Sequence, residues 1–197
     1  CDLSPAQEEV DALRSFLNEG GKWFGLHGTN ALIEFVGEMQ IVDGLEIPGK
    51  TDTPNKNPEL MELLGSRFVA HPPNMSIKVK VNDKSHPITK DLNDFEIFDE
   101  PYYCEFSDGI KVLLESRYTD DADAYVNSSW KEDIPRPQMY LHKVGKGGVL
   151  YLMLGHCRGK YDMRPFMDEC PVDRGGWDSE VFYELLRRGI KWGINKI

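Results

Sequence analysis

Apolar residues fall at helical spacing near both ends of the chain. Near the start, a cap at Asp2 or Ser4 and Pro5 at the first helical position predict a helix that Gly20-Gly21 ends. Near the end, Ser179 precedes an amphipathic helix. The pattern also predicts a short helix over residues 59–64 and an apolar helix starting in residues 31–36. The inward residues of the two long helices are Val10, Leu13, Phe16 and Leu17, and Val181, Phe182, Leu185, Leu186, Ile190 and Trp192.

Short apolar or alternating runs between the helices predict strands. Residues 149–154 form a continuous apolar run, which is typical of a strand buried on both faces. Residues 76–81 alternate apolar and polar positions, as a half-buried strand does. The remaining predicted strands are residues 23–26, 95–100, 111–117 and 138–143, and the predicted loops are residues 44–58, 119–136 and 157–177.

This succession of helices and strands predicts an α/β fold. The first helix is followed by a strand but not preceded by one, although a parallel unit needs a strand there. We therefore expect a single domain over residues 1–197 that is incomplete at its N-terminal end. Residues 145–148 are glycine-rich, but they lack the ending of a phosphate loop and precede a strand. They predict a hairpin turn, and we expect no nucleotide cofactor.

The charge balance limits the classes of partner. The chain of 197 residues carries 23 Lys and Arg against 33 Asp and Glu, a net charge of -10. A nucleic acid or an anionic membrane would require a basic face, so we expect neither. The four cysteines show no CxxC spacing and predict free thiols in a reducing, cytoplasmic compartment, although an exported form with its signal removed stays open. The last helix could cover the core or form the face of a homo-oligomer.

Three predicted strands end in residues that bind metals or transfer protons: His27, Glu100 and His156. Ligands of open α/β sheets bind at the carboxyl ends of strands. If the strands before His27 and His156 are parallel neighbours, both imidazoles face one crevice. Two histidines and a carboxylate could hold zinc or another divalent metal. The same three groups could also act as acid and base without a metal, or be separate strand ends satisfied by backbone.

Other polar and aromatic residues are weaker candidates. His71 and His86 each precede proline and are interpreted as ordered loop residues, and His142 as structural. Asp99 could orient a ligand or be a solvated strand-end charge. Cys157 could be a nucleophile, but an ordinary thiol is the simpler interpretation. The candidate sugar-binding residues are Thr29, Asn30, Tyr102, Trp130, Arg158 and Tyr161.

In this order, the motifs resemble the ThuA-like (trehalose-utilisation) family. The matching segments are Asp2-Leu3-Ser4, residues 20–29 (Gly-Gly-Lys-Trp-Phe-Gly-Leu-His-Gly-Thr), His86-Pro87-Ile88-Thr89, Phe98-Asp99-Glu100-Pro101-Tyr102, and residues 147–156, which end in Leu154-Gly155-His156. The resemblance implies a flavodoxin-like, class I glutamine-amidotransferase-like three-layer sandwich with a mostly parallel central sheet. It also implies that the family's first strand-helix-strand segment is missing from this sequence.

The resemblance further implies a substrate class. The position of the amidotransferase cysteine is occupied by His27, so glutamine hydrolysis is not expected. The expected function is carbohydrate metabolism, on a disaccharide or keto-sugar of the trehalose type, through His27, Glu100 and His156. A non-catalytic carbohydrate-binding or interaction module is the alternative, and a divergent hydrolase that uses Cys157 is a third.

Overall fold

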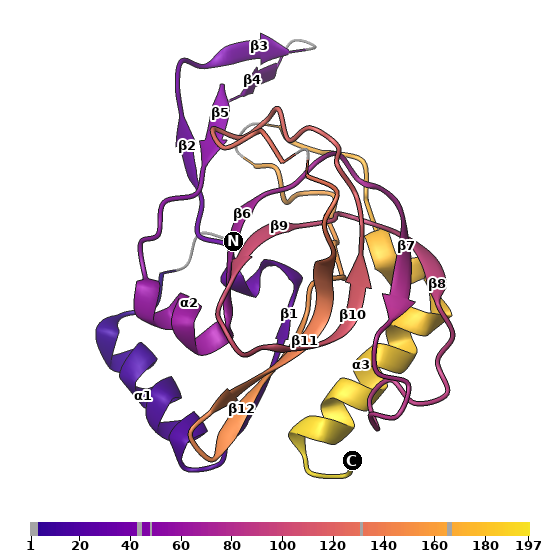
Figure 1. Ribbon diagram of the computed structural model, residues 1–197. Coiled ribbons are helices and arrows are strands. Elements are labelled where there is room, and N and C mark those ends of the chain that lie inside the picture. The colour runs from indigo at the N-terminus through magenta and orange to yellow at the C-terminus, as the bar shows by residue number, and fades with distance from the viewer. Residues whose placement is uncertain (1–3, 43–44, 48, 131, 165–166) are drawn as a thin grey trace.

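The computed structural model describes residues 4–42, 45–47, 49–130, 132–164 and 167–197, and a six-stranded mixed sheet is its largest element (Figure 1). The strand order is β1-β12-β11-β10-β7-β8. The bounds are β1 Lys22–Leu26, β12 Gly147–Leu152, β11 Arg136–Val144, β10 Lys111–Ser116, β7 Met75–Val81 and β8 Phe95–Asp99. The predicted α/β class is therefore correct, and each of these strands was expected near its observed position. The alternative helix cap predicted at Asp2 lies outside the described residues.

The expectation of a mostly parallel sheet is wrong for the described strands. Within this sheet, β1 and β12 pair in parallel, and the other four pairings are antiparallel. The reason is local: Gly145-Lys146 turns β11 directly into β12, with Val144 opposite Gly147. A two-residue turn can join only antiparallel strands, because a parallel pair needs a long crossover. The parallel β1–β12 pair is nevertheless the one that the predicted site required.

Three two-stranded sheets complete the strand content of the described chain. They pair β2 (Glu34–Val36) with β5 (Lys50–Asp52), β3 (Gln40–Val42) with β4 (Leu45–Ile47), and β6 (Ser66–Ala70) with β9 (Tyr103–Phe106). The predicted helix in residues 31–36 is therefore wrong, and so is the loop over much of residues 44–58. Ala31 and Leu32 are buried in the core, but the chain continues into β2, which projects with β3–β5 away from the main sheet (Figure 1).

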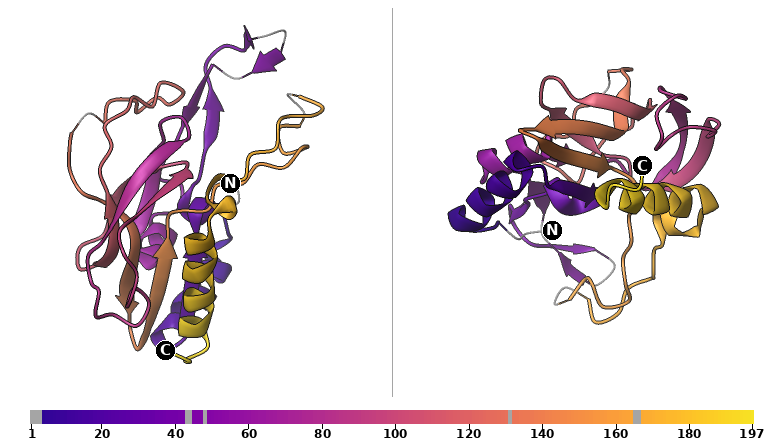
Figure 2. Two further views of the ribbon diagram at one scale, coloured as in Figure 1. Left: turned by 90° about the vertical axis from the view of Figure 1, so that its right-hand side faces the viewer. Right: turned by 90° about the horizontal axis from the view of Figure 1, so that it is seen from below.

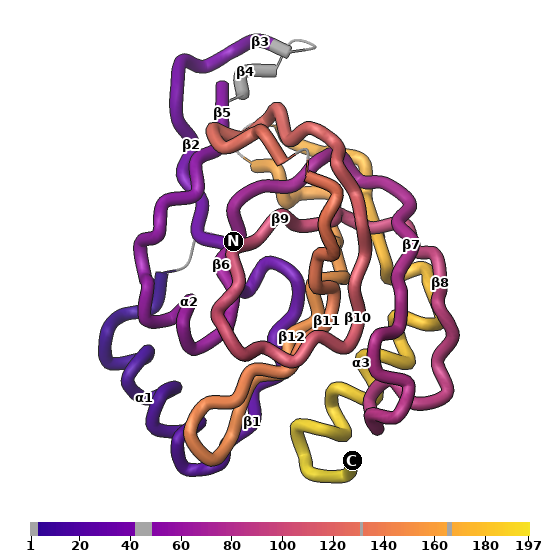
Figure 3. The backbone as a smooth tube through the Cα atoms, viewed as in Figure 1, coloured from indigo at the N-terminus to yellow at the C-terminus, as the bar shows by residue number. Residues whose placement is uncertain are grey.

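Three α-helices pack beside the sheet: α1 (Gln7–Asn18), α2 (Pro58–Leu64) and α3 (Glu180–Gly193). Helix α1 begins later than the predicted cap, because Ala6 occupies the cap position and its N–H donates to the Glu9 carboxylate at 2.8 Å. Helix α3 lies along β1 (Figure 2). Gly189 meets the Phe24 ring so closely that a Cβ on it would come within 2.2 Å of the ring. The path of the chain between these elements can be followed in Figure 3.

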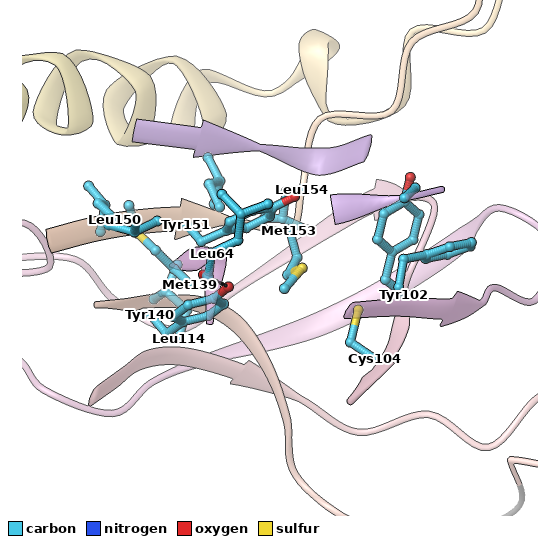
Figure 4. Packing of buried hydrophobic residues seen from close by; sticks show 14 of the residues in the cluster. Leu64, Tyr102, Cys104, Leu114, Met139, Tyr140, Leu150, Tyr151, Met153 and Leu154 are labelled. Carbon is cyan, nitrogen blue, oxygen red and sulfur yellow. Dashed lines mark hydrogen bonds between the residues drawn. The ribbon is translucent and has the colours of Figure 1, made fainter. Parts of the chain in front are cut away.

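Two stacked tyrosines connect the core to the end of β1. The rings of Tyr140 and Tyr151 are nearly parallel, and their centroids lie 5.5 Å apart (Figure 4). The Tyr151 hydroxyl donates to the His27 carbonyl at 2.7 Å and accepts from the Asn30 N–H at 2.8 Å. A buried hydroxyl that is fully partnered fixes the groups that it contacts. The core therefore holds the turn that carries His27 in place.

Helix α3 offers a prediction for acid stability. Hydrogen bonds from Arg187 and Arg188 lower the pKa of Glu184 from 4.5 to about 2. A carboxyl group with a lowered pKa stabilises the fold above pH 4.5, and this contribution is lost as the pH falls towards 2. Glu184→Gln should flatten the acid-side loss of stability in that window, by less than about 1 kcal/mol because the pair lies near the surface. Thermal unfolding followed by circular dichroism measures this, and superimposable pH profiles of the two proteins would contradict it.

Within the described residues, no helix has both the length and the apolar composition needed to cross a membrane.

Candidate functional site

His27 stands directly after β1, at the start of the 3-10 turn η1 (His27–Asn30). Its φ of 37° lies in the left-handed region, which non-glycine residues rarely adopt. Such strain persists only where surrounding contacts impose it, and here the Tyr151 hydroxyl bonds the His27 carbonyl. The imidazole Nδ1 lies 2.8 Å from the Met153 carbonyl oxygen. Because a carbonyl can only accept, Nδ1 carries the hydrogen, and Nε2 is the nitrogen left to face the site.

Glu100 follows β8, and its carboxylate is contacted by three imidazoles. Oε2 lies 3.2 Å from His27 Nε2, while Oε1 lies 3.2 Å from His71 Nε2 and 3.3 Å from His156 Nδ1. Burial raises the pKa of Glu100, but the hydrogen bonds with His156 and His27 and the charge of His71 outweigh it, so the net pKa lies well below its ordinary value. Glu100 is therefore an ionised carboxylate at the centre of the cluster.

Asp99, the last residue of β8, links the end of that strand to the segment that follows β12. Its side chain is fully buried. The carboxylate accepts the N–H groups of Gly155 at 2.8 Å, His156 at 3.0 Å and Glu100 at 2.8 Å. Burial raises the pKa of Asp99, and these backbone hydrogen bonds partly offset the rise. The interpretation of Asp99 as a solvated strand-end charge is therefore wrong, since it holds the backbone on which two site residues stand.

His156 lies between two carboxylates. Nδ1 faces Glu100, and Nε2 lies 3.7 Å from Asp173 Oδ2, too far for a hydrogen bond. Among the described residues, Nε2 is a buried nitrogen without a hydrogen-bond partner. Asp173 is itself held by Asn74 at 2.5 Å and by the Gly175 N–H at 3.0 Å. Burial lowers the pKa of His156, but Glu100 and Asp173 outweigh it and raise the net pKa. His156 is thus suited to holding a positive charge or a proton.

His71 was interpreted as an ordered loop residue, but the structure places it beside Glu100. The residue follows β6 directly, and its Nε2 contacts Glu100. Burial lowers the pKa of His71, and the Glu100 charge opposes this. The sequence signal that was missed is its position, because His27, Glu100 and His71 each come immediately after a strand. By contrast, His86 accepts the Ile88 N–H within its own turn, and His142 packs against Gly65.

The residues predicted to bind sugar are not all at this cluster. Tyr102 is, because its hydroxyl donates to His27 Nε2 at 2.8 Å. Thr29 donates to the Leu26 carbonyl inside the turn. Asn30 is fully buried and donates to the Ser66 hydroxyl. Trp130 stacks on Tyr103.

The last two sugar-binding candidates lie on the segment that follows His156. The backbone of Arg158 pairs with that of Asp173, whose carboxylate lies near the His156 ring, so this segment runs next to His156. Tyr161 is exposed, and the Arg164 guanidinium lies 4.4 Å from the centre of its ring.

The donor atoms fit a small cation. One nitrogen from His27, one from His156 and one Glu100 oxygen all lie within 4.8 Å of one another. The three side chains are mostly buried, at 13%, 14% and 10% exposed. Two imidazoles and a carboxylate are a ligand set that binds zinc and other divalent transition metals with positions left open. Without a metal, the same groups can exchange protons.

Comparison with known proteins identifies the family of this chain. The family model described as ThuA, trehalose utilisation, matches residues 47–170, which is more than half of the chain. The chain belongs to the ThuA family. The resemblance seen in the sequence motifs is thereby confirmed. A comparison with curated proteins finds no match.

Solved structures resemble this ThuA chain over nearly its whole length. A ThuA-like protein from Bacteroides uniformis has a TM-score of 0.61 at 20% identity over 98% of this chain, and one from Parabacteroides merdae has 0.59 at 18% over 97%. The ThuA chain spans 66% of the length of each. A β-galactosidase from Rahnella sp. R3 has a TM-score of 0.50 at 12% identity over 96% of this chain and 21% of its own. At these identities the likeness concerns the fold alone.

The cysteines of this ThuA chain give a labelling prediction that bears on the Cys157 alternative. Burial raises the pKa of Cys104 to about 12, whereas Cys157 is exposed. Since the thiolate is the reactive form, iodoacetamide at about pH 8 should modify Cys157 and spare Cys104. Peptide mass spectrometry measures both. Labelling of Cys104 in the folded protein would contradict the packing described here, and loss of activity on labelling would favour a nucleophilic Cys157.

Proposed function

We propose that this ThuA-family protein acts on a disaccharide or keto-sugar of the trehalose type, with His27, Glu100 and His156 as its reaction centre. The observation that carries the proposal is the contact between His27 and Glu100. With its hydrogen on Nδ1, a neutral His27 presents a lone pair to a carboxylate oxygen 3.2 Å away. The Tyr102 hydroxyl donates to this nitrogen, but the nitrogen and the carboxylate oxygen attract each other only if a positive charge lies between or beside them. That charge is either a proton or a metal ion.

We further propose that the charge is a divalent cation, zinc or a similar ion. His27 Nε2, His156 Nδ1 and one Glu100 oxygen would hold it. The buried Asp99 supports this role, because it orders the backbone of Glu100 and His156 before any ligand binds. A bound cation of this kind polarises a carbonyl group or activates water, which are the steps that a keto-sugar or a glycosidic bond requires.

The chain's own residues supply the proton transfers. When no cation is bound, His156, whose pKa is raised by its two carboxylate neighbours, is suited to donate a proton to a sugar oxygen. The Tyr102 hydroxyl donates to His27 Nε2 and helps to hold that imidazole at the site. The Met153 carbonyl orients the His27 imidazole, and Asp99 holds the backbone of His156.

Turnover of a sugar panel tests the proposal. Trehalose, maltose and their ring-oxidised keto derivatives are incubated with the protein and Zn²⁺, and the products are separated by chromatography. We expect conversion of at least one keto-sugar or disaccharide, and its loss in His27→Ala and His156→Ala. His86→Gln is the matched control, because His86 lies in a separate turn, and it should retain activity. Full activity of both alanine variants would contradict the proposal.

One observation favours a second candidate, a carbohydrate-binding module without catalysis. The same fold makes up about a fifth of a β-galactosidase chain, so it occurs as one part of a larger sugar-processing protein. Calorimetric binding of the same sugars without turnover, unchanged in Glu100→Gln, would favour this candidate.

A further inference from the structure

One buried tyrosine differs from the others in what its hydroxyl contacts. In the described part of the chain, the buried tyrosines are Tyr102, Tyr103, Tyr118, Tyr125, Tyr140 and Tyr151. Five of these hydroxyls donate to an acceptor of the protein at distances between 2.5 Å and 2.8 Å. Among the described residues, the Tyr125 hydroxyl alone has no such acceptor. An unpaired polar group at a buried residue costs free energy, so this hydroxyl requires an explanation.

The Tyr125 hydroxyl is unbonded within the protein, but it is not enclosed. The residue as a whole is 7% exposed. Within the described ranges, the side-chain atoms that are both enclosed and without a partner belong to Asn30, Ser116, Gln138 and His156. Tyr125 is not among them, so its small exposed part includes the hydroxyl. A hydroxyl that reaches the surface from an otherwise buried ring is available to a ligand.

The Tyr125 ring packs against the residues around Glu100. It stands edge-on to the His71 ring with centroids 5.0 Å apart, and His71 Nε2 lies 3.2 Å from the Glu100 carboxylate. The Phe68 ring contacts both Tyr125, at 5.7 Å between centroids, and Tyr102, at 4.4 Å. Burial raises the pKa of Tyr125, and the nearby charge of Glu100 raises it further, so the hydroxyl keeps its hydrogen. Tyr125 therefore brings a hydrogen-bond donor to the side of the cluster.

Backbone hydrogen bonds fix the position of Tyr125. The Thr51 N–H donates to the Ala124 carbonyl at 2.8 Å, and the Val126 N–H donates to the Thr51 carbonyl at 2.9 Å. The Tyr125 N–H itself donates to the Ala122 carbonyl at 2.9 Å. The loop over residues 119–136 is thus tied to β5 at this residue. A donor that is already held in place loses little conformational freedom when a ligand binds.

We infer that Tyr125 is a substrate-binding residue whose hydroxyl donates a hydrogen bond to one oxygen of the sugar at the centre formed by His27, Glu100 and His156. This inference rests on the proposed function and adds to it a residue that determines specificity. An analogue that lacks the matching oxygen leaves the mostly buried donor unpaired and binds less tightly. Tyr125 therefore distinguishes a sugar from its deoxy analogue and takes no part in proton transfer.

Tyr125→Phe removes the hydroxyl and keeps the ring, so its effect on the ligand-free protein is the first test. Its melting temperature should stay within about 1 °C of the wild type, because no hydrogen bond within the protein is lost. Tyr118→Phe is the matched control, since that hydroxyl donates to the Tyr102 carbonyl at 2.6 Å and accepts from Gln138 at 3.3 Å. Its melting temperature should fall by about 2–4 °C. An equal fall in Tyr125→Phe would reveal a partner inside the protein and overturn the inference.

Turnover and calorimetry with trehalose, maltose, their keto derivatives and the monodeoxy analogues of each test the recognition itself. For the sugar that the wild type prefers, Tyr125→Phe should raise KM or Kd about 3–10-fold and leave kcat nearly unchanged. The wild type should bind one monodeoxy analogue more weakly than the parent sugar by a similar factor, and Tyr125→Phe should bind the two alike.

Tyr183→Phe, on an exposed position of α3, is the control for binding and should behave as the wild type does. Equal affinity of the wild type and Tyr125→Phe for the parent sugar would overturn the inference and leave the proposed function standing. A wild type that neither binds nor converts any of these sugars would overturn both.

Discussion

Asp99→Asn is expected to destabilise the protein by about 2–4 kcal/mol, as the loss of one partner in a buried charged network does. The Asp99 carboxylate accepts N–H groups from Gly155, His156 and Glu100. An amide at this position must direct its NH₂ group at one of these donors, so two donors meet with no acceptor between them. The ends of β8 and β12 then separate, and we expect divalent metal binding and sugar turnover to be lost together.

The measurement is urea unfolding followed by tryptophan fluorescence, at neutral pH and without added metal. Asp108→Asn is the matched control, because Asp108 is exposed in the turn between β9 and β10. Its free energy of unfolding should stay within about 0.5 kcal/mol of the wild type. A similarly small change in Asp99→Asn would mean that the buried carboxylate does not hold the two strand ends, and the geometry of the site would need another explanation.

Gly147→Ala is expected to be the most destabilising single-methyl substitution considered, at about 3 kcal/mol or more, because it overpacks a site bounded by backbone. A Cβ at Gly147 would lie 1.9 Å from the Gly21 carbonyl oxygen and 2.7 Å from that of Leu17. Neither backbone oxygen can move aside as a flexible side chain would. Gly147 begins β12, so the substitution pushes β12 away from the end of α1 and from the start of β1.

Gly193→Ala is the matched control for Gly147→Ala. A Cβ there meets nothing within 4 Å, and Gly193 ends helix α3. Alanine should be neutral or stabilising by up to about 1 kcal/mol, since it has the higher helix propensity. Chemical unfolding of both variants gives the comparison, and soluble expression decides the case if Gly147→Ala does not fold. Equal stability of the two variants would show that β1 and β12 do not approach as closely as the structure has them.

The strands and three of the site residues could be predicted because their signals are local. The apolar run over residues 149–154 indicates a buried strand whatever its neighbours are, and polar residues that follow such a strand lie at a sheet edge. This is enough to select His27, Glu100 and His156. It does not determine which strands pair. The expected mostly parallel sheet is wrong because no helix crosses over between β7 and β8, between β10 and β11, or between β11 and β12, and each of these pairs is antiparallel.

His71 also follows a strand directly, but its place beside Glu100 depends on a long-range pairing. Strand β6 pairs with β9, which begins at Tyr103, just after Glu100. That pairing carries the residue after β6 to the carboxylate after β8. No spacing in the sequence indicates the β6–β9 pairing. Asn30 is a different case, since this polar residue lies in the turn after β1 but is buried and donates to Ser66, which its sequence position does not indicate.

The zinc content of the purified chain tests the central claim most directly. After incubation with a small excess of Zn²⁺ and removal of unbound ion, elemental analysis should find close to one zinc per chain in the wild type. It should find almost none in Glu100→Gln or in the double variant of His27→Ala with His156→Ala, while both stay folded by circular dichroism. A wild type that retains no zinc, or variants that retain as much as the wild type, would contradict a cation centre at these three residues.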